Sequence, residues 1–178
     1  MFRLLSASLL LAACTAGCHG PGPYGHAPNY EAQDDETKAI ANARDFDAVA
    51  YGRQPDEWRK GAVMVFGVVD SRTPGPGGQA MLALSVRRLE PRNFCEKQGD
   101  DDTCRVTVSD KDYGVVYALV ALHGDDDTGP RAVGSKSMVR VVGTIGEDVN
   151  NAPVVHATYY RHWPVDAYVT RSMTGDVH

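Results

Sequence analysis

The densest group of side chains that could bind a ligand lies near the end of the chain. Residues 159–164 read Tyr-Tyr-Arg-His-Trp-Pro, and arginine among aromatic rings suits stacking on sugars, bases or another protein. The candidate binding patch comprises Tyr159, Tyr160, Arg161 and Trp163, and Trp58 is expected to join it. The alternative is structural: some of these rings fill the end of a barrel, and the others cover a sheet edge.

No catalytic constellation accompanies this patch. The chain contains no G-x-S-x-G, no H-E-x-x-H and no phosphate-binding glycine loop. His123, His156 and His162 could serve as general bases, but no acid or nucleophile stands at a spacing that would use them. We therefore expect a protein that is not an enzyme, with no catalytic residues and no cofactor.

An acidic run occurs twice, as Gly-Asp-Asp-Asp-Thr at residues 99–103 and again at 124–128. Carboxylates in loops can ligate Ca²⁺, but these acids do not alternate along twelve residues as in an EF-hand. Adjacent acids also point in different directions on an extended chain. We expect solvated acids in turns, and no metal site.

The start of the chain has the order of a secretory signal peptide. Arg3 supplies a positive charge, residues 4–13 are apolar apart from two serines, and small residues lead to Cys14. The apolar segment is too short to span the roughly 30 Å hydrocarbon core of a bilayer. Residues 11–14, Leu-Ala-Ala-Cys, resemble a bacterial lipoprotein box. The resemblance implies cleavage before Cys14 and acylation of its sulfur.

Cys18 is the alternative lipidation site. It also follows small residues, but it lacks the aliphatic residue three positions upstream that the lipoprotein pattern favours. Cleavage before Cys18 would leave Cys95 and Cys104 to pair, whereas cleavage before Cys14 leaves Cys18 as a spare thiol. We predict Cys14, because the apolar run ends there; the remaining alternative is a cleaved signal without lipid. Thr15 is not the aspartate that retains lipoproteins in the inner membrane, so the resemblance implies an outer-membrane anchor.

Cys95 and Cys104 bracket an acidic loop at residues 96–103. An exported chain favours disulfides, and redox pairs usually have two intervening residues. No histidine lies between these cysteines that would suggest a metal site. We predict a disulfide that stabilises the fold by about 2–3 kcal/mol; a metal or redox pair is the alternative.

Length and charge indicate one acidic domain on a tether. The 178 residues hold 18 Lys and Arg and 23 Asp and Glu, a net charge of −5. Net acidity argues against a nucleic-acid-binding surface, so no nucleic-acid partner is expected. We expect a signal peptide at 1–13, a flexible Gly/Pro-rich tether at 14–33, a barrel domain at 34–171 and a tail at 172–178.

Periodicity predicts a helix followed by short strands. Apolar residues recur at three- and four-residue steps over 34–50, which predicts a helix with acids at its start. Strands are predicted at 62–69, 81–86, 104–108, 115–122, 138–145 and 154–160. Gly67 and Gly143 lie inside strands, where glycines mark bulges or bends. The expected fold class is mainly β: a small OB-like antiparallel barrel of five to six strands with one N-terminal helix.

Several motifs follow one another in the order of a known lipoprotein family. Residues 46–49, Phe-Asp-Ala-Val, precede Pro-Asp-Glu-Trp at 55–58, Gly61 and the strand Val-Phe-Gly-Val-Val at 65–69. Residues 139–145 then read Val-Arg-Val-Val-Gly-Thr-Ile. This order, over roughly residues 46–146, resembles the Slp family of Gram-negative outer-membrane lipoproteins. The chain departs from that pattern in its Cys95–Cys104 loop and its ending at 161–164. The resemblance implies an envelope lipoprotein with no known chemistry.

Together these features predict a lipid-anchored envelope protein, held to the membrane through its N-terminal lipid, that binds or scaffolds other envelope components. An envelope protein is the expected partner. Two alternatives remain from the sequence: a glycan- or small-molecule-binding module that uses the aromatic patch, and a subunit of a secretion or assembly complex.

Overall fold

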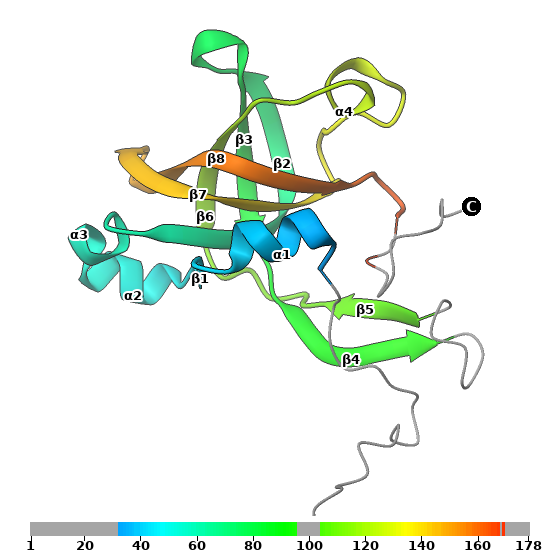
Figure 1. The fold of residues 1–178 in the computed structure, drawn as a ribbon, viewed down its shortest axis with the longest axis horizontal. Helices are drawn as coiled ribbons and strands as arrows, with labels where there is room; N and C mark the ends of the chain where they lie inside the picture. The colour runs from blue at the N-terminus through cyan, green and yellow to red at the C-terminus, as the bar shows by residue number, and fades with distance from the viewer. Residues whose placement is uncertain (1–31, 96–103, 168, 170–178) are drawn as a thin grey trace, which may run out of the picture.

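Five strands close into a barrel in the computed structural model, which describes residues 32–95, 104–167 and 169 (Figure 1). These strands are β2 (Ala62–Pro74), β3 (Ala80–Val86), β6 (Val115–Val120), β7 (Met138–Val149) and β8 (Ala152–Trp163). Their order is β2-β3-β6-β8-β7, and β7 pairs again with β2. The β6–β8 pairing is parallel and the others are antiparallel. This closed five-stranded arrangement is that of an OB barrel, so the predicted fold class is confirmed.

The barrel core is filled by small branched side chains on alternate positions of these strands. Because successive side chains of a strand point to opposite faces, Val139 and Val141 enter the core while Arg140 faces outward. The core residues that are almost fully excluded from solvent are Val63, Val65, Val69, Leu82, Leu84, Val116, Ala118, Val120, Val139, Val141 and Val155. Most of these core residues are valines, whose β-branched side chains favour strands.

Two glycines allow strands of the barrel to approach each other closely. A Cβ atom at Gly143 would lie 2.0 Å from the carbonyl oxygen of His156, and the β7–β8 register shifts next to this glycine. A Cβ atom at Gly67 would lie 2.7 Å from the carbonyl oxygen of Ser85. The predicted irregularity at Gly143 is therefore a register shift, and Gly67 is a point of close backbone contact.

The segment before the barrel is not the continuous helix that was predicted over 34–50. Helix α1 (Asp34–Ile40) ends, and β1 (Arg44–Asp45) pairs in parallel with Val63–Met64 of β2. Helix α2 (Ala48–Arg53) then begins at Asp47, whose Oδ1 accepts the N–H groups of Val49 and Ala50 at 2.9 Å. Helix α3 (Pro55–Trp58) follows. In the sequence, the helical spacing of apolar residues continues across this break. The helix is nevertheless interrupted, because residues 44–45 pair with β2 and Asp47 caps a new helix.

The remaining elements lie at the ends of the barrel. A short 3₁₀ turn η1 (Pro76–Gly78) links β2 to β3, and helix α4 (Asp125–Thr128) lies between β6 and β7. Strands β4 (Leu89–Cys95) and β5 (Cys104–Val108) form a separate antiparallel ribbon (Figure 1). Strand β4 has no counterpart among the predicted strands. Within the described part of the chain, no helix has the length and apolar character needed to cross a membrane.

Candidate functional site

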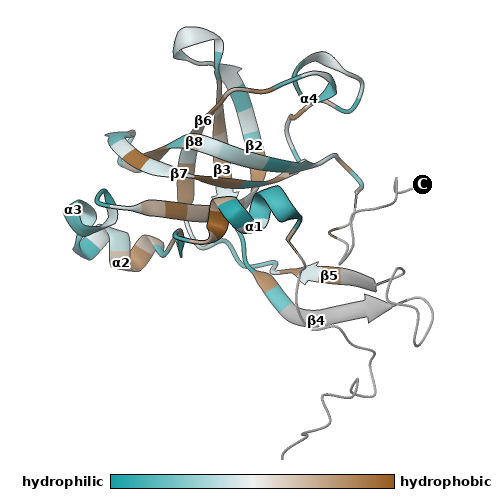
Figure 2. Cartoon of the chain, in the orientation of Figure 1, coloured by the Kyte–Doolittle hydropathy of each residue, from teal (hydrophilic) through white to brown (hydrophobic). Residues whose placement is uncertain are grey.

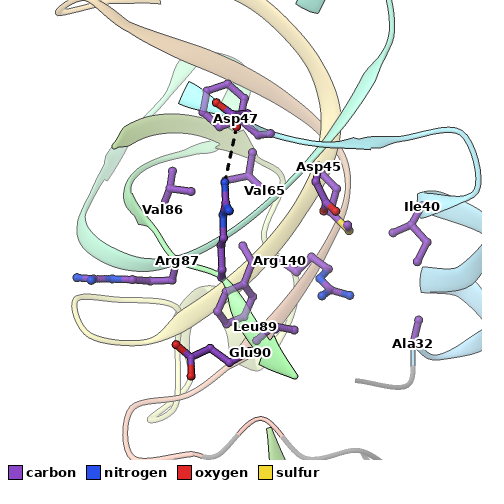
Figure 3. A pocket seen from close by; sticks show the side chains of 14 residues that line it. Ala32, Ile40, Asp45, Asp47, Val65, Val86, Arg87, Leu89, Glu90 and Arg140 are labelled. Atoms are coloured by element: carbon purple, nitrogen blue, oxygen red, sulfur yellow. Dashed lines mark ion pairs between the residues drawn. The ribbon is translucent and has the colours of Figure 1, made fainter. Parts of the chain in front are cut away.

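A cavity of about 590 Å³ opens on the outer side of the barrel wall. It lies between α1, β1, the outer face of β2 and the start of β4 (Figure 3). Its apolar lining consists of Ala32, Ile40, Phe46, Met64, Val65, Phe66, Val86 and Leu89, and its polar lining of Asp45, Asp47, Arg87, Arg88, Glu90 and Arg140. Eight apolar and six charged residues therefore share its lining, and a mixture of apolar surface with a few polar groups is usual in small binding sites.

The rim of this cavity is held by ion pairs and ring contacts. The Arg88 guanidinium lies 3.7 Å from an Asp47 carboxylate oxygen (Figure 3) and 4.3 Å from the centre of the Tyr113 ring. Hydrogen bonds from the Ala50 and Val49 backbone N–H groups, helped by Arg88, lower the pKa of Asp47. Asp47 is therefore ionised at neutral pH, and a ligand meets a rim that carries both signs of charge.

One wall of the cavity is continuous with a buried cluster of charged side chains. Glu36 of α1 is fully buried, and its Oε1 lies 2.7 Å from Arg140 Nη1 of β7. Its Oε2 lies 2.6 Å from Arg161 Nη1 of β8 and 3.4 Å from the backbone nitrogen of Gln33. The two arginines are direct register partners on neighbouring strands. Burial, and secondarily the negative charge of Glu36, raise the pKa of Tyr159 beside this cluster.

The predicted aromatic patch does not exist as one exposed surface. Trp163 is 1% exposed and Trp58 is 8% exposed, and they belong to different apolar clusters. Arg161 is buried in the Glu36 cluster, while Tyr159 and Tyr160 are half-buried. The expectation of exposed stacking groups at the two tryptophans is therefore wrong.

Different neighbours account for the burial of these residues: the β4–β5 ribbon at Trp163, α1 at Arg161 and Phe46 at Trp58. Trp163 and Phe66, whose ring centres are 5.7 Å apart at 71°, pack with Val106 of β5 and with Val169. Trp58 instead packs edge-on against Phe46 at 5.7 Å. The outer face of β2, β7 and β8 around Phe66 and Trp163 is thus covered by other parts of the same chain, an arrangement that was not predicted from the sequence.

The second acidic run contacts the barrel. Asp126 of α4 accepts a hydrogen bond from the Tyr160 hydroxyl at 3.0 Å and lies 2.7 Å from His162 Nδ1. Asp127 forms an ion pair with Arg72 of β2. Two of the three acids therefore bind protein side chains, which corrects the expectation of purely solvated turn acids. No group of three or more metal-ligating side chains occurs among the residues that the structure describes.

Cys14 and Cys18 lie outside the described residues. The β4–β5 ladder places Cys95 directly opposite Cys104, which is the backbone relation that a cross-strand disulfide requires. The disulfide itself remains a prediction.

Comparison with known proteins identifies no family. No family model matches the chain, and no curated protein matches it. Among solved structures, the chain is similar to the protein priB from Ralstonia solanacearum, with 13% identity and a TM-score of 0.30, over 57% of this chain and 97% of that one. It is also similar to a Plasmodium falciparum SSB complex with ssDNA, with 12% identity and a TM-score of 0.28, over 59% of this chain and 94% of that one. These likenesses concern the fold alone.

One expectation about partners is corrected by these comparisons. Net acidity of the chain suggested that nucleic acid could not be a partner, yet one similar structure is a complex with single-stranded DNA. A whole-chain charge of −5 does not by itself exclude a ligand class, because local groups of charged side chains decide what a surface binds.

Proposed function

We propose that this protein is a lipid-anchored, non-enzymatic component of the bacterial envelope whose barrel binds another envelope component in the cavity beside α1. The observation that carries this proposal is the cavity itself, about 590 Å³ in volume and lined by both apolar and charged residues. That size and composition suit a ligand group with an apolar body and a polar or charged end.

The sequence before the barrel supports the anchoring half of the proposal. Residues 11–14 form the lipoprotein-like box, and the described structure begins at residue 32. Fully extended, the residues between could reach about 60 Å, and their Gly/Pro-rich composition suits a tether. Ala32 lines the cavity, so the binding site lies where such a tether joins the domain. The order of motifs that resembles the Slp lipoproteins supports the same location, in the outer membrane.

Site-specific photo-crosslinking in intact cells tests the binding half. A photo-reactive amino acid replaces Leu89, which lines the cavity, and in a matched control replaces Val149, which is exposed at the end of β7. We expect a discrete adduct from position 89 and none from position 149. Equal adducts from both positions, or none from either, would contradict a binding role for the cavity.

Charge reversal at the rim sharpens this test. Arg87 lines the cavity, whereas Lys136 is exposed and is not among the residues that line the cavity. We expect Arg87→Glu to weaken the adduct at position 89 because the rim charge is reversed, and Lys136→Glu to leave it unchanged. An adduct that responds equally to both variants would mean that net charge, not the cavity, determines binding.

A further inference from the structure

Helix α1 is attached to the barrel through a carboxylate more than through apolar packing. Glu36 is the buried residue of this helix, and its other side chains are exposed or half-buried. Figure 2 shows α1 as largely hydrophilic, with apolar residues confined to its end. Helices α2 and α3, by contrast, each bury an aromatic ring, Tyr51 and Trp58. The position of α1 therefore depends mainly on what Glu36 binds.

The groups that bind Glu36 belong to the barrel strands β7 and β8 and not to the segment that contains α1. Arg140 and Arg161 are fixed opposite each other by the β7–β8 ladder, and their side chains are 9% and 5% exposed. Each guanidinium binds a different oxygen of the same carboxylate, at 2.7 and 2.6 Å. Two arginines arranged around one planar carboxylate form a specific carboxylate site. The barrel wall thus presents this site, and α1 supplies its occupant.

We propose that Arg140 and Arg161 form a binding site for an acidic side chain of a partner polypeptide, and that Glu36 occupies it as an internal competitor which the partner displaces. This inference rests on the proposed binding function, because Arg140 also lines the cavity. Ala32 and Ile40 lie on the same wall of the cavity (Figure 3), so displacement of α1 would widen it. An acidic peptide is the favoured ligand because the carboxylate now in the site is the side chain of a glutamate in a helix.

Competition by α1 predicts how a free peptide should behave. A segment joined to the barrel by a short linker competes at a millimolar or higher effective concentration. A free acidic peptide should therefore bind the native chain weakly. Glu36→Gln removes the internal carboxylate, so the same peptide should bind that variant at least tenfold more tightly.

The experiment uses the full chain and a fluorescent synthetic peptide with the sequence of residues 32–43, followed by anisotropy. The matched control variant is Asp35→Asn, which removes a neighbouring carboxylate that pairs with Lys38 in solvent. We expect the peptide to bind tightly to the Glu36→Gln protein and weakly to the native chain and to the Asp35→Asn protein. A peptide in which glutamine replaces the glutamate of position 36 should bind none of them. Adding Arg161→Gln to Glu36→Gln should abolish binding. If Glu36→Gln does not fold, Glu36→Asp, whose shorter side chain reaches the arginines less well, takes its place.

Two results would overturn the inference. One is a folded Glu36→Gln variant, or Glu36→Asp in its place, that binds the peptide no more tightly than the native chain does. The other is inorganic phosphate competing at the same concentration as the peptide, which would make the site a general oxyanion site. Neither result depends on the membrane. If the peptide binds in solution but position 89 gives no crosslink, the proposed function is refuted and this site is kept. If position 89 gives a crosslink but the peptide does not bind, this site alone is refuted.

Discussion

Replacing Trp163 with alanine should destabilise the whole fold. The side chain is 1% exposed and belongs to one apolar cluster with Phe66 and Val106, which come from distant parts of the chain, and with the nearby Val169. Removing a buried tryptophan side chain costs about 3–5 kcal/mol of folding free energy, because buried surface is lost and a cavity remains. For a domain of this size we expect the melting temperature to fall by roughly 6–20 °C.

A nearby exposed residue gives the matched control for this prediction. Val165 lies two positions further along and is 46% exposed, so Val165→Ala should change stability by less than about 0.5 kcal/mol. Both variants are measured by urea unfolding and by thermal unfolding of the full chain. A loss below about 1 kcal/mol at Trp163→Ala would refute the packing argument, since values that small are typical of sites away from the core.

The contact between the two rings can be measured separately. Trp163 and Phe66 meet edge to face at 5.7 Å and 71°, a geometry worth about 0.5–1.5 kcal/mol beyond buried area. A double-mutant cycle with Phe66→Leu and Trp163→Ala should give a coupling energy in that range. Independent, additive effects of the two substitutions would show that the rings do not interact as described.

Three further predictions follow from contacts elsewhere in the chain. Gly143→Ala should cost about 1–3 kcal/mol or more, because its Cβ would lie 2.0 Å from the His156 carbonyl oxygen, whereas Gly61→Ala, with open space around it, should be nearly neutral in the same thermal unfolding assay. Cys104→Ser should lower the free energy of unfolding by about 2–3 kcal/mol, because the predicted disulfide is lost. Peptide mapping without reductant should find Cys95 linked to Cys104, and finding both thiols free in exported protein would refute the disulfide. Burial and a hydrogen bond to Asp148 raise the pKa of Tyr51 to about 12. The stability that the protonated Tyr51 contributes is therefore complete below pH 10 and is lost as the pH rises from 10 to 12. Tyr51→Phe should remove that part of the pH dependence of the unfolding free energy measured in urea.

Strand positions could be predicted because apolar and β-branched residues gather in short runs separated by turn residues. The runs predicted at 62–69, 81–86 and 138–145 lie within β2, β3 and β7, although β2 and β7 extend four or five residues further. Strand β4 (Leu89–Cys95) was missed because its sequence contains a proline, two charged residues and an asparagine and has no β-branched residue, so it lacks the composition typical of a strand. The helix predicted over 34–50 failed where β1 pairs with β2, a contact that local spacing does not encode.

The candidate site could be predicted far less well. Glu36 appeared as one acid among three at the start of a helix, and its partners Arg140 and Arg161 lie 104 and 125 residues away. The alternation of β8 places Arg161 and Trp163 on one face, but only the ribbon and α1 decide that this face is buried. A pair of arginines on the outer face of adjacent strands was the available signal, and the pairing of β7 with β8 was needed to see it.

The most direct test of the central claim, that this barrel works from a membrane, is the intact mass of the protein extracted with detergent from cell envelopes. We predict a chain that begins at Cys14 and carries the added mass of a diacylglyceryl group, recovered in the outer-membrane fraction. A chain that begins at Cys18 with the same modification would move the anchor by four residues and keep the claim. A water-soluble chain beginning at a residue other than cysteine would contradict it.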